Sequence, residues 1–291
     1  MTSFKDEIGN QVLILDGAMG TMVQNLGLTD AAFGGPEFKM LTDLLVFSRP
    51  DDLEGIHLAY LQAGANLIET DTFGASPLRL NEFDFSKFDS SDLKAIPDQL
   101  DLKTCSLESL AFELNTQGCR IAKRAIEKYR TQSDYDGRPL FVAGSIGPSN
   151  YVVSSTDASL NKGTFSQIVE NFYHQVLGLI EGGADVLLIE TQQDILETKA
   201  IITGANKAFA EKKIKLPMIV QATVDVFSKM QIFNTDIHAA YTAVSKMGID
   251  VFGINCNVGP DEMVSTVEKL SQFCKHPISV VPNAGQPISE D

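Results

Sequence analysis

Acidic, hydroxyl, amide and thiol side chains follow the short apolar runs of this sequence, where an active site could be assembled. The clearest examples are Asp16-Gly17, Glu190 and Cys256. No lysine or arginine belongs to the set, so it suits a ligand with an ammonium group, whose carboxylate could meet glycine-flanked backbone N–H groups. An amino acid fits this description, and a phosphorylated substrate fits poorly. The remaining members are Thr21, Glu69, Thr70, Asp71, Thr72, Ser145, Thr191, Thr223, Asp225, Asn255, Asn257 and Asn283.

Each of these residues also has a purely structural interpretation. Asp16-Gly17 could form a tight turn, Glu190 could cap a helix, and Cys256 could be a small buried hydrophobic residue. Thr70 and Thr72 could simply line a barrel, and Asn283 could be a turn residue. Their joint occurrence after successive apolar runs favours the functional interpretation.

The elements that must position these residues are predicted by hydrophobic periodicity. Apolar runs of four to six residues read as buried parallel strands, and longer helical patterns lie between them. The expected strands are 12–15, 67–70, 140–145, 186–190, 218–223, 250–255 and 278–282, and the expected helices are 51–63, 106–130, 164–181, 193–212, 236–247 and 260–273.

This alternation predicts an α/β fold, a TIM-type (β/α)8 barrel in which about seven strands are present and the eighth βα unit is missing. A doubly wound open sheet is the competing architecture, but the sequence lacks a dinucleotide-binding fingerprint. We expect one domain over residues 1–291. Two segments break the period: a long connection at 24–50 and a polar, acidic insertion at 81–105 after the second strand.

Composition excludes several functional classes. The net charge of −15 argues against nucleic acid and anionic lipid as partners. No apolar run is long enough to span a membrane, and the N-terminus lacks the pattern of a signal peptide. Four cysteines in 291 residues do not make a disulfide framework. We therefore expect a cytoplasmic protein.

Five segments occur in an order that carries a family resemblance. They are 15–22 (LDGAMGTM), 68–75 (IETDTFGA), 183–191 (GADVLLIET), 253–256 (GINC) followed by 259–262 (GPDE), and 282–285 (PNAG). Together they resemble the homocysteine S-methyltransferase family, and within it the homocysteine-binding domain of cobalamin-dependent methionine synthase. The resemblance runs from about residue 10 to the last residue and implies a (β/α)8 barrel. The opening motif and residues 42–50 look more like the cobalamin-dependent branch than the betaine-dependent one.

The resemblance implies a chemistry and residue roles. Family members transfer a methyl group to the sulfur of homocysteine, whose thiolate joins three cysteine thiolates on a zinc ion. Coordination deprotonates the thiol and leaves the sulfur nucleophilic. Cys256 matches the first zinc ligand, and Asn283 matches an asparagine beside the metal. The positions that match residues holding the amino and carboxylate groups of homocysteine are Asp16, Gly17, Thr70, Thr72 and Glu190.

The sequence departs from the family pattern at the metal site. The adjacent Cys-Cys pair that supplies the other two zinc ligands is absent, and Cys105, Cys119 and Cys274 are poor substitutes by position. We therefore expect a C-terminally truncated domain: a fragment, a split subunit or the product of a decayed gene. Two smaller departures are Asp71, where the family commonly has asparagine, and the loop at 228–233.

The sequence thus predicts a methyltransferase module that activates homocysteine on zinc for methylation by methylcobalamin. The cobalamin-bearing and folate domains would lie elsewhere in the complete protein, and activity of this chain alone is doubtful. Two alternatives stay open. One is a homocysteine methyltransferase that uses betaine or S-methylmethionine, and the other is a metal-free, non-catalytic amino-acid-binding module.

Overall fold

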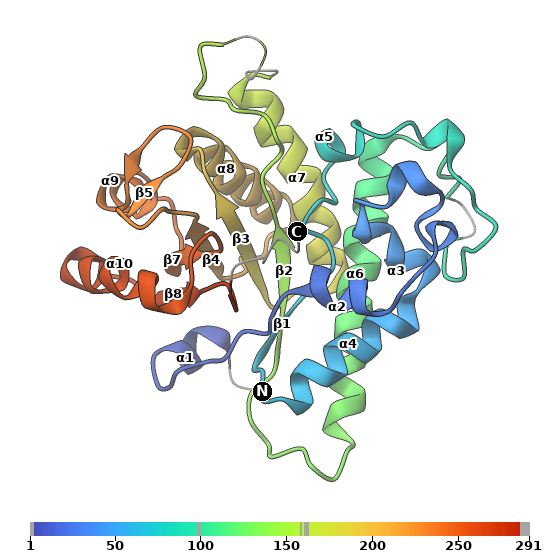
Figure 1. Cartoon of the computed structure of the whole chain (residues 1–291), viewed down its shortest axis with the longest axis horizontal. Helices are drawn as coiled ribbons and strands as arrows, with labels where there is room; N and C mark the ends of the chain where they lie inside the picture. Colours follow the sequence, from blue (N-terminus) through green and yellow to red (C-terminus); the bar gives the residue numbers. More distant parts are fainter. Residues whose placement is uncertain (1–2, 98–99, 158, 160–162, 286–291) are drawn as a thin grey trace, which may run out of the picture.

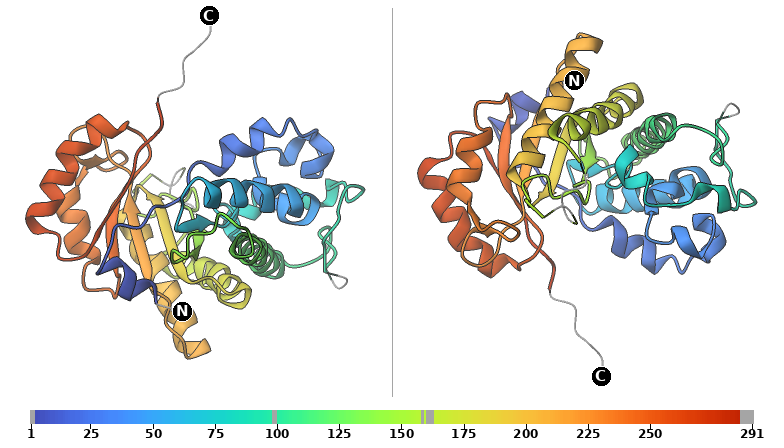
Figure 2. Two further views of the ribbon diagram at one scale, coloured as in Figure 1. Left: turned by 90° about the horizontal axis from the view of Figure 1, so that it is seen from below. Right: turned by 90° about the horizontal axis from the view of Figure 1, so that it is seen from above.

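A curved sheet of parallel strands forms the centre of the molecule (Figure 2). The computed structural model describes residues 3–97, 100–157, 159 and 163–285. Every neighbouring pair in this six-stranded sheet is parallel, so the predicted α/β half-barrel is confirmed. The strand order is β1 (Leu67–Glu69), β2 (Phe141–Ile146), β3 (Val186–Gln192), β4 (Met218–Ala222), β7 (Val251–Asn255) and β8 (Ile278–Val281).

Six longer helices follow the predicted pattern and surround the outer face of the sheet (Figure 1). Their ends obey ordinary capping rules: Thr164 and Gln167 form a capping box, and Gly183 ends the same helix with a φ of 88°. None of the helices that the structure describes is long and apolar enough to cross a membrane. The helices are α4 (Pro50–Gln62), α6 (Leu107–Arg130), α7 (Phe165–Gly182), α8 (Ile195–Lys212), α9 (Ile237–Val244) and α10 (Pro260–Phe273).

The predicted first strand, at 12–15, is wrong as a strand. Leu15 makes a single parallel bridge to Leu67, and the side chain of Asn66 accepts the N–H of Ile14 at 3.0 Å, where a strand would offer a carbonyl group. Ile14 is 54% exposed, so half of this segment's apolar surface stays in water. The sheet therefore has six strands instead of seven, with residues 12–15 lying along its edge.

The two faces of the sheet have different partners because side chains alternate along each strand. Leu67, Ala143, Leu188 and their neighbours form a buried cluster on the concave face. The short helix α1 (Phe4–Ile8) closes that cluster from below, since Phe4 packs edge-on against Phe141 with ring centroids 5.6 Å apart. The alternate residues, such as Ile68, pack against the outer helices.

The two irregular segments lie side by side, away from β8 (Figure 1). Phe38 stacks on Phe83, with ring centroids 5.9 Å apart, and contacts Phe85 and Phe88 of the insertion. Backbone N–H groups of residues 94 and 95 both donate to the carbonyl of Phe47. The short elements here are α2 (Met19–Asn25), η1 (Asp30–Phe33), η2 (Pro36–Phe38), η3 (Thr42–Leu44), α3 (Leu45–Ser48), α5 (Pro77–Leu80) and η4 (Phe85–Lys87).

A small antiparallel hairpin follows β4, made of β5 (Lys229–Met230) and β6 (Thr235–Asp236). It occupies the loop at 228–233 that departs from the family pattern. Gln231 donates to the side chain of Asn257 at 2.9 Å, which ties the hairpin to the loop that follows β7.

Glycines let the outer helices approach each other closely. A Cβ atom on Gly178 of α7 would lie 2.5 Å from the carbonyl oxygen of Phe112 in α6, and one on Gly182 would lie 2.6 Å from that of Thr116. On the other side, a Cβ atom on Gly204 of α8 would lie 2.6 Å from the carbonyl oxygen of Val169 in α7. These backbone contacts bind α6, α7 and α8 into one packed layer behind β2 and β3.

This packing predicts opposite effects for two glycine-to-alanine changes. Gly178→Ala should destabilise the fold by about 1–3 kcal/mol, because the new methyl group collides with backbone atoms that cannot rotate away. Gly55 lies at an exposed position of α4, and a Cβ atom there would have no neighbour within 4 Å. Gly55→Ala should therefore stabilise the fold by about 0.5–1 kcal/mol through helix propensity. Urea unfolding of both variants measures the difference, and equal effects would contradict the tight α6–α7 contact.

Candidate functional site

Three carboxyl groups meet at the carboxyl ends of the strands, where barrel enzymes place their chemistry. Asp16 follows the edge segment, Glu69 ends β1, and Glu190 lies in β3. The N–H of Glu69 donates to Asp16 Oδ2 at 2.9 Å. The hydroxyl of Ser145 in β2 donates to Glu190 Oε1 at 2.6 Å. We call Asp16, Glu69 and Glu190 the acid cluster.

Burial and mutual repulsion make the acid cluster hold protons unusually tightly. Burial raises the pKa of Asp16 to about 8, and the Glu190 carboxylate adds to the effect while the Glu69 N–H opposes it. Burial also raises the pKa of Glu190 to about 7, against hydrogen bonds from Ser145 and Thr191. The pKa of Glu69 lies well above its usual value because of burial first, and then the charges of Glu190, Asp16 and Cys256. A cation between these groups would relieve that cost.

Cys256 lies beside the acid cluster on an unusual piece of backbone. Its φ is 60°, and that of Thr191 at the end of β3 is 59°, a region that side chains other than glycine rarely adopt. The Thr191 hydroxyl lies 3.9 Å from Cys256 Sγ. Strained backbone of this kind is concentrated at functional sites, so its presence in both residues supports a functional role for the thiol.

Asn255 connects the thiol with the acid cluster. Its Nδ2 group donates to Thr191 Oγ1 at 2.9 Å and to Cys256 Sγ at 3.3 Å, and it lies 3.4 Å from Glu190 Oε2. Its Oδ1 atom accepts the N–H of Thr191 at 2.9 Å. Burial raises the pKa of Cys256, and the nearby Glu190 charge acts in the same direction.

Gly17 and Asn283 flank this site. A Cβ atom on Gly17 would lie 3.0 Å from the hydroxyl oxygen of Tyr60, so the turn after Asp16 leaves little room for a side chain. The Asn283 N–H donates to the carbonyl of Val258 at 3.0 Å, which places Asn283 beside the loop that carries Cys256.

Thr70 and Thr72 do not face the acid cluster. They are 2% and 0% exposed, their hydroxyls lie 2.6 Å apart, and Thr72 Oγ1 donates to the carbonyl of Ser145 at 2.9 Å. A Cβ atom on Gly118 of α6 would lie 2.6 Å from Thr72 Cγ2, so these side chains point toward the helices. The structure gives them a supporting position behind β1 and β2.

Asp71 forms a second buried carboxyl pair, with Asp43 of η3. Asp71 Oδ1 accepts the Thr42 hydroxyl at 3.0 Å, and Asp43 Oδ1 accepts the Gly74 N–H at 2.8 Å. Burial raises the pKa of Asp71 to about 8, and the Asp43 charge adds to this. This pair joins the connection at 24–50 to the end of β1.

The residues present do not by themselves make a three-thiolate metal site. Cys119 is buried in α6, Cys274 follows α10 at the far end of the strands, and Cys105 packs with the insertion. Across residues 3–97, 100–157, 159 and 163–285, no three cysteine, histidine or acidic side chains are placed to hold a metal ion. Cys256 is therefore a single candidate ligand, and we derive no step through a metal.

Glu69, Ser145 and Asn255 are the site residues to which sequence reasoning assigned no role. All three stand at predicted strand ends, so their position was visible. The missing information was the face on which each side chain lies. Side chains alternate along β1: Leu67 lies on the concave face and Ile68 on the face that packs against the outer helices. Glu69 therefore lies on the concave face.

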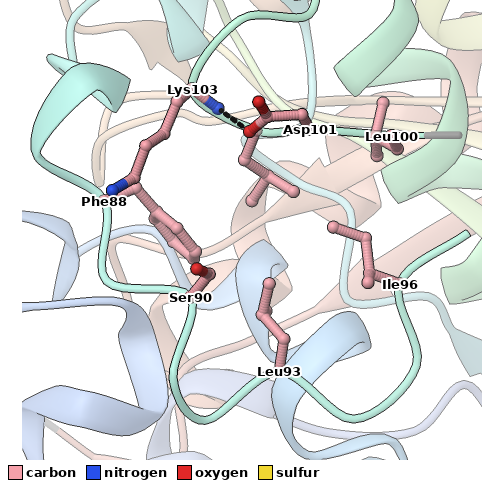
Figure 3. Close-up of a pocket in the computed structure, with 8 residues that line it drawn as sticks. Phe88, Ser90, Leu93, Ile96, Leu100, Asp101 and Lys103 are labelled. Atoms are coloured by element: carbon pink, nitrogen blue, oxygen red, sulfur yellow. Dashed lines mark hydrogen bonds between the residues drawn. The ribbon is translucent and has the colours of Figure 1, made fainter. Parts of the chain in front are cut away.

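A hollow in the insertion is a poor rival for the functional site (Figure 3). Its charged groups are Asp101 and Lys103, and the Asp101 carboxylate is already bonded to the Lys103 N–H at 3.0 Å and the Thr104 hydroxyl at 2.9 Å. The rest of its lining is mostly apolar: Phe88, Ser90, Leu93, Ile96, Leu100 and Leu102.

Comparison with known proteins agrees with this geometry. The profile of the homocysteine S-methyltransferase family matches residues 13–291. The chain belongs to this family. Methionine synthases of Mycobacterium leprae and Mycobacterium tuberculosis are 32% and 33% identical over 287 residues, which is 99% of this chain. The chain spans about a fifth of the length of these relatives, since the match covers 21% of each.

Solved structures show the same fold. The homocysteine methyltransferase MmuM from Escherichia coli superposes with a TM-score of 0.71 in its metallated form and 0.72 in its oxidized form, at 21% identity. The match covers 96% of this chain and 86% and 85% of the two MmuM chains. At this identity the likeness to MmuM concerns the fold of the family alone.

The raised pKa values predict that stability falls as the pH rises. Between about pH 5 and 7 the folded protein keeps protons on Asp16 and Glu190 that the unfolded chain loses, so its stability falls as the pH rises. The slope fades above about pH 8, where these groups are ionised in both states. Asp16→Asn should flatten this slope, and a residual slope should remain from Asp71 and Glu197, whose pKa values burial raises to about 8 and about 7. Urea unfolding at several pH values measures the slope.

The matched control is Glu268→Gln, which removes an exposed carboxylate from α10. It should leave the slope of the parent protein unchanged. A parent stability that is flat or rising over this interval would show that the acid cluster is not protonated as described.

Proposed function

We propose that this chain is the homocysteine-binding module of a methionine synthase. It would hold homocysteine at the acid cluster with the substrate sulfur next to Cys256, for transfer of a methyl group from methylcobalamin to give methionine. The observation that carries the proposal is the position of three buried carboxyl groups beside a thiol at the carboxyl ends of the strands, in a chain of this family.

The charges of the site favour a free amino acid. None of the ion pairs among the described residues includes Asp16, Glu69 or Glu190. Asp16 Oδ1 is buried without a hydrogen-bond partner. An α-ammonium group would satisfy this atom and would stabilise the ionised form of the acid cluster.

The turn after Asp16 supports a place for the substrate carboxylate. It leads through Gly17 into α2, whose first turn has no side-chain cap and no acidic residue. Backbone N–H groups at such a turn suit an anion. The side chain of homocysteine would then run from the acid cluster toward Cys256, with Asn283 at the neighbouring loop.

The metal and the rest of the enzyme belong to the proposal as well. Cys256 would supply one thiolate to a zinc ion, whose other thiolate ligands lie outside these 291 residues. A zinc ion held there would supply Lewis-acid chemistry, which lowers the pKa of a coordinated thiol. The relatives are about five times longer than the match, which supports further domains in the complete protein. We propose that these domains bind cobalamin and folate and that the protein is cytoplasmic.

Two other outcomes stay distinguishable. If methionine forms from betaine or S-methylmethionine, and not from methylcobalamin, the chain belongs to a methyltransferase that uses one of those two donors. Homocysteine binding that zinc never alters in the natural gene product would favour a non-catalytic binding module. Methionine quantified by mass spectrometry with each donor in turn separates the first outcome, and calorimetry with and without a chelator separates the second.

The direct test is calorimetry of the 291-residue chain with L-homocysteine in the presence of a chelator and a reductant. We expect binding, and we expect Asp16→Asn to weaken it about 10- to 100-fold, because a charged hydrogen bond to the ammonium is lost. Cys256→Ser should change the affinity less than about threefold under these conditions, since the thiol does not contact the ammonium. Glu268→Gln is the control for charge, and absence of homocysteine binding by the parent chain would overturn the proposal.

A further inference from the structure

Glu69 lies on the concave face of the sheet, directly above its apolar floor. In β1 the side chains of Leu67 and Glu69 face inward, and Leu67 packs in the cluster with Ala143. The backbone register pairs Glu69 with Ala143 of β2. The neighbour of Glu69 across the ladder is therefore a single methyl group, which neither donates a hydrogen bond to the carboxyl group nor carries a charge.

Glu69 is the acid of the cluster that is most open to a ligand. Asp16 and Glu190 are each 8% exposed, whereas Glu69 is intermediate in exposure. Hydrogen bonds also differ: Glu190 accepts from Ser145 and Asn255, and Asp16 accepts one from the Glu69 backbone. Across the described parts of the chain, no donor reaches the Glu69 carboxyl group itself.

The number of free acceptors matches one particular group. An ammonium has three N–H donors. Asp16 offers its buried, unpartnered Oδ1 atom, Glu190 offers the carboxylate held by Ser145, and Glu69 offers a carboxyl group with no other partner among the described residues. Two carboxylates would leave one donor of the ammonium to water, and Glu69 completes the set.

We propose that Glu69 is a specificity-determining residue that makes an α-ammonium group a requirement for any thiol bound at this site. The inference rests on the proposed function, because it assigns the residue to the same amino-acid site. Glu69 contributes the third hydrogen bond to an ammonium. A thiol that carries a carboxylate but no amino group offers Glu69 no ammonium donor, so it gains none of this hydrogen bonding.

The test compares L-homocysteine with 4-mercaptobutyrate, which is homocysteine without its amino group. Calorimetry of the parent chain should show binding of L-homocysteine and at least about 100-fold weaker binding of the analogue. Glu69→Gln should weaken L-homocysteine about tenfold, through loss of one charged hydrogen bond, and should leave the affinity for the analogue within about twofold. The ratio of the two affinities should therefore fall by about tenfold.

Two further variants separate this role from a structural one. Glu69→Asp keeps the charge and shortens the side chain, so it should weaken L-homocysteine but keep the rejection of 4-mercaptobutyrate. Glu268→Gln removes a remote exposed carboxylate and should leave both affinities unchanged. A Glu69→Gln variant that only loosens the fold would weaken both ligands together, and that result would overturn the inference.

The remaining outcomes are also decisive. If the parent binds L-homocysteine and Glu69→Gln changes the ratio less than twofold, Glu69 is not the determinant and the proposed function stands. If the parent binds L-homocysteine and the analogue equally, the acid cluster does not select for the ammonium group, and the inference is wrong. If the parent binds neither ligand, the proposed function fails together with the inference.

Discussion

The hydrogen bond from the Glu69 N–H to the Asp16 carboxylate is the interaction on which the site depends. It spans 53 residues of sequence and brings the first acid of the cluster onto the end of β1. Residues 12–15 make a single bridge to β1, where the Asp16 N–H donates to the Leu67 carbonyl and the Ile14 carbonyl accepts the Leu67 N–H. Asn66 supports it from below by accepting the Ile14 N–H and donating to the carbonyl of Pro139 at 3.0 Å. These hydrogen bonds fix the position of the turn. They also bury Asp16 and bring it into the acid cluster.

The acid cluster is costly for the fold. Carboxyl groups that are buried beside one another resist ionisation, and the chain already carries a net charge of −15. A structure selected for stability alone would place apolar residues there, as it does one layer deeper in the concave floor. Proteins commonly retain such unfavourable groups where a ligand compensates for them, and the family membership of the chain agrees with that interpretation.

Much of the fold was predictable because helix and strand periods are strong signals in this chain. The predicted helix at 260–273 coincides with α10, since proline at its start and acids in its first turn mark the boundary. The strand at 12–15 was not predictable as an edge segment, because its apolar composition resembles that of a buried strand. The Ile14 N–H bonds to the side chain of Asn66, a contact that periodicity does not reveal. In the site, Asp16, Glu190 and Cys256 were placed near one another by their position after apolar runs. Periodicity separates Glu69 from Thr70 and Thr72, but it does not say which of the two faces is the concave one. Packing of Thr72 against Gly118 places the threonines on the helix side.

The glycine contacts among α6, α7 and α8 give the two sides of the acid cluster different stiffness. Ser145 and Glu190 belong to strands backed by helices whose main chains touch, so neither can shift without moving a whole layer. Asp16 belongs to a segment that is joined to the sheet by one bridge and a few hydrogen bonds. A ligand that draws the carboxyl groups together therefore moves Asp16 at a smaller free-energy cost than Glu190. The β3 side of the acid cluster is therefore the rigid side. Any adjustment to the size of a ligand would come from the segment that carries Asp16.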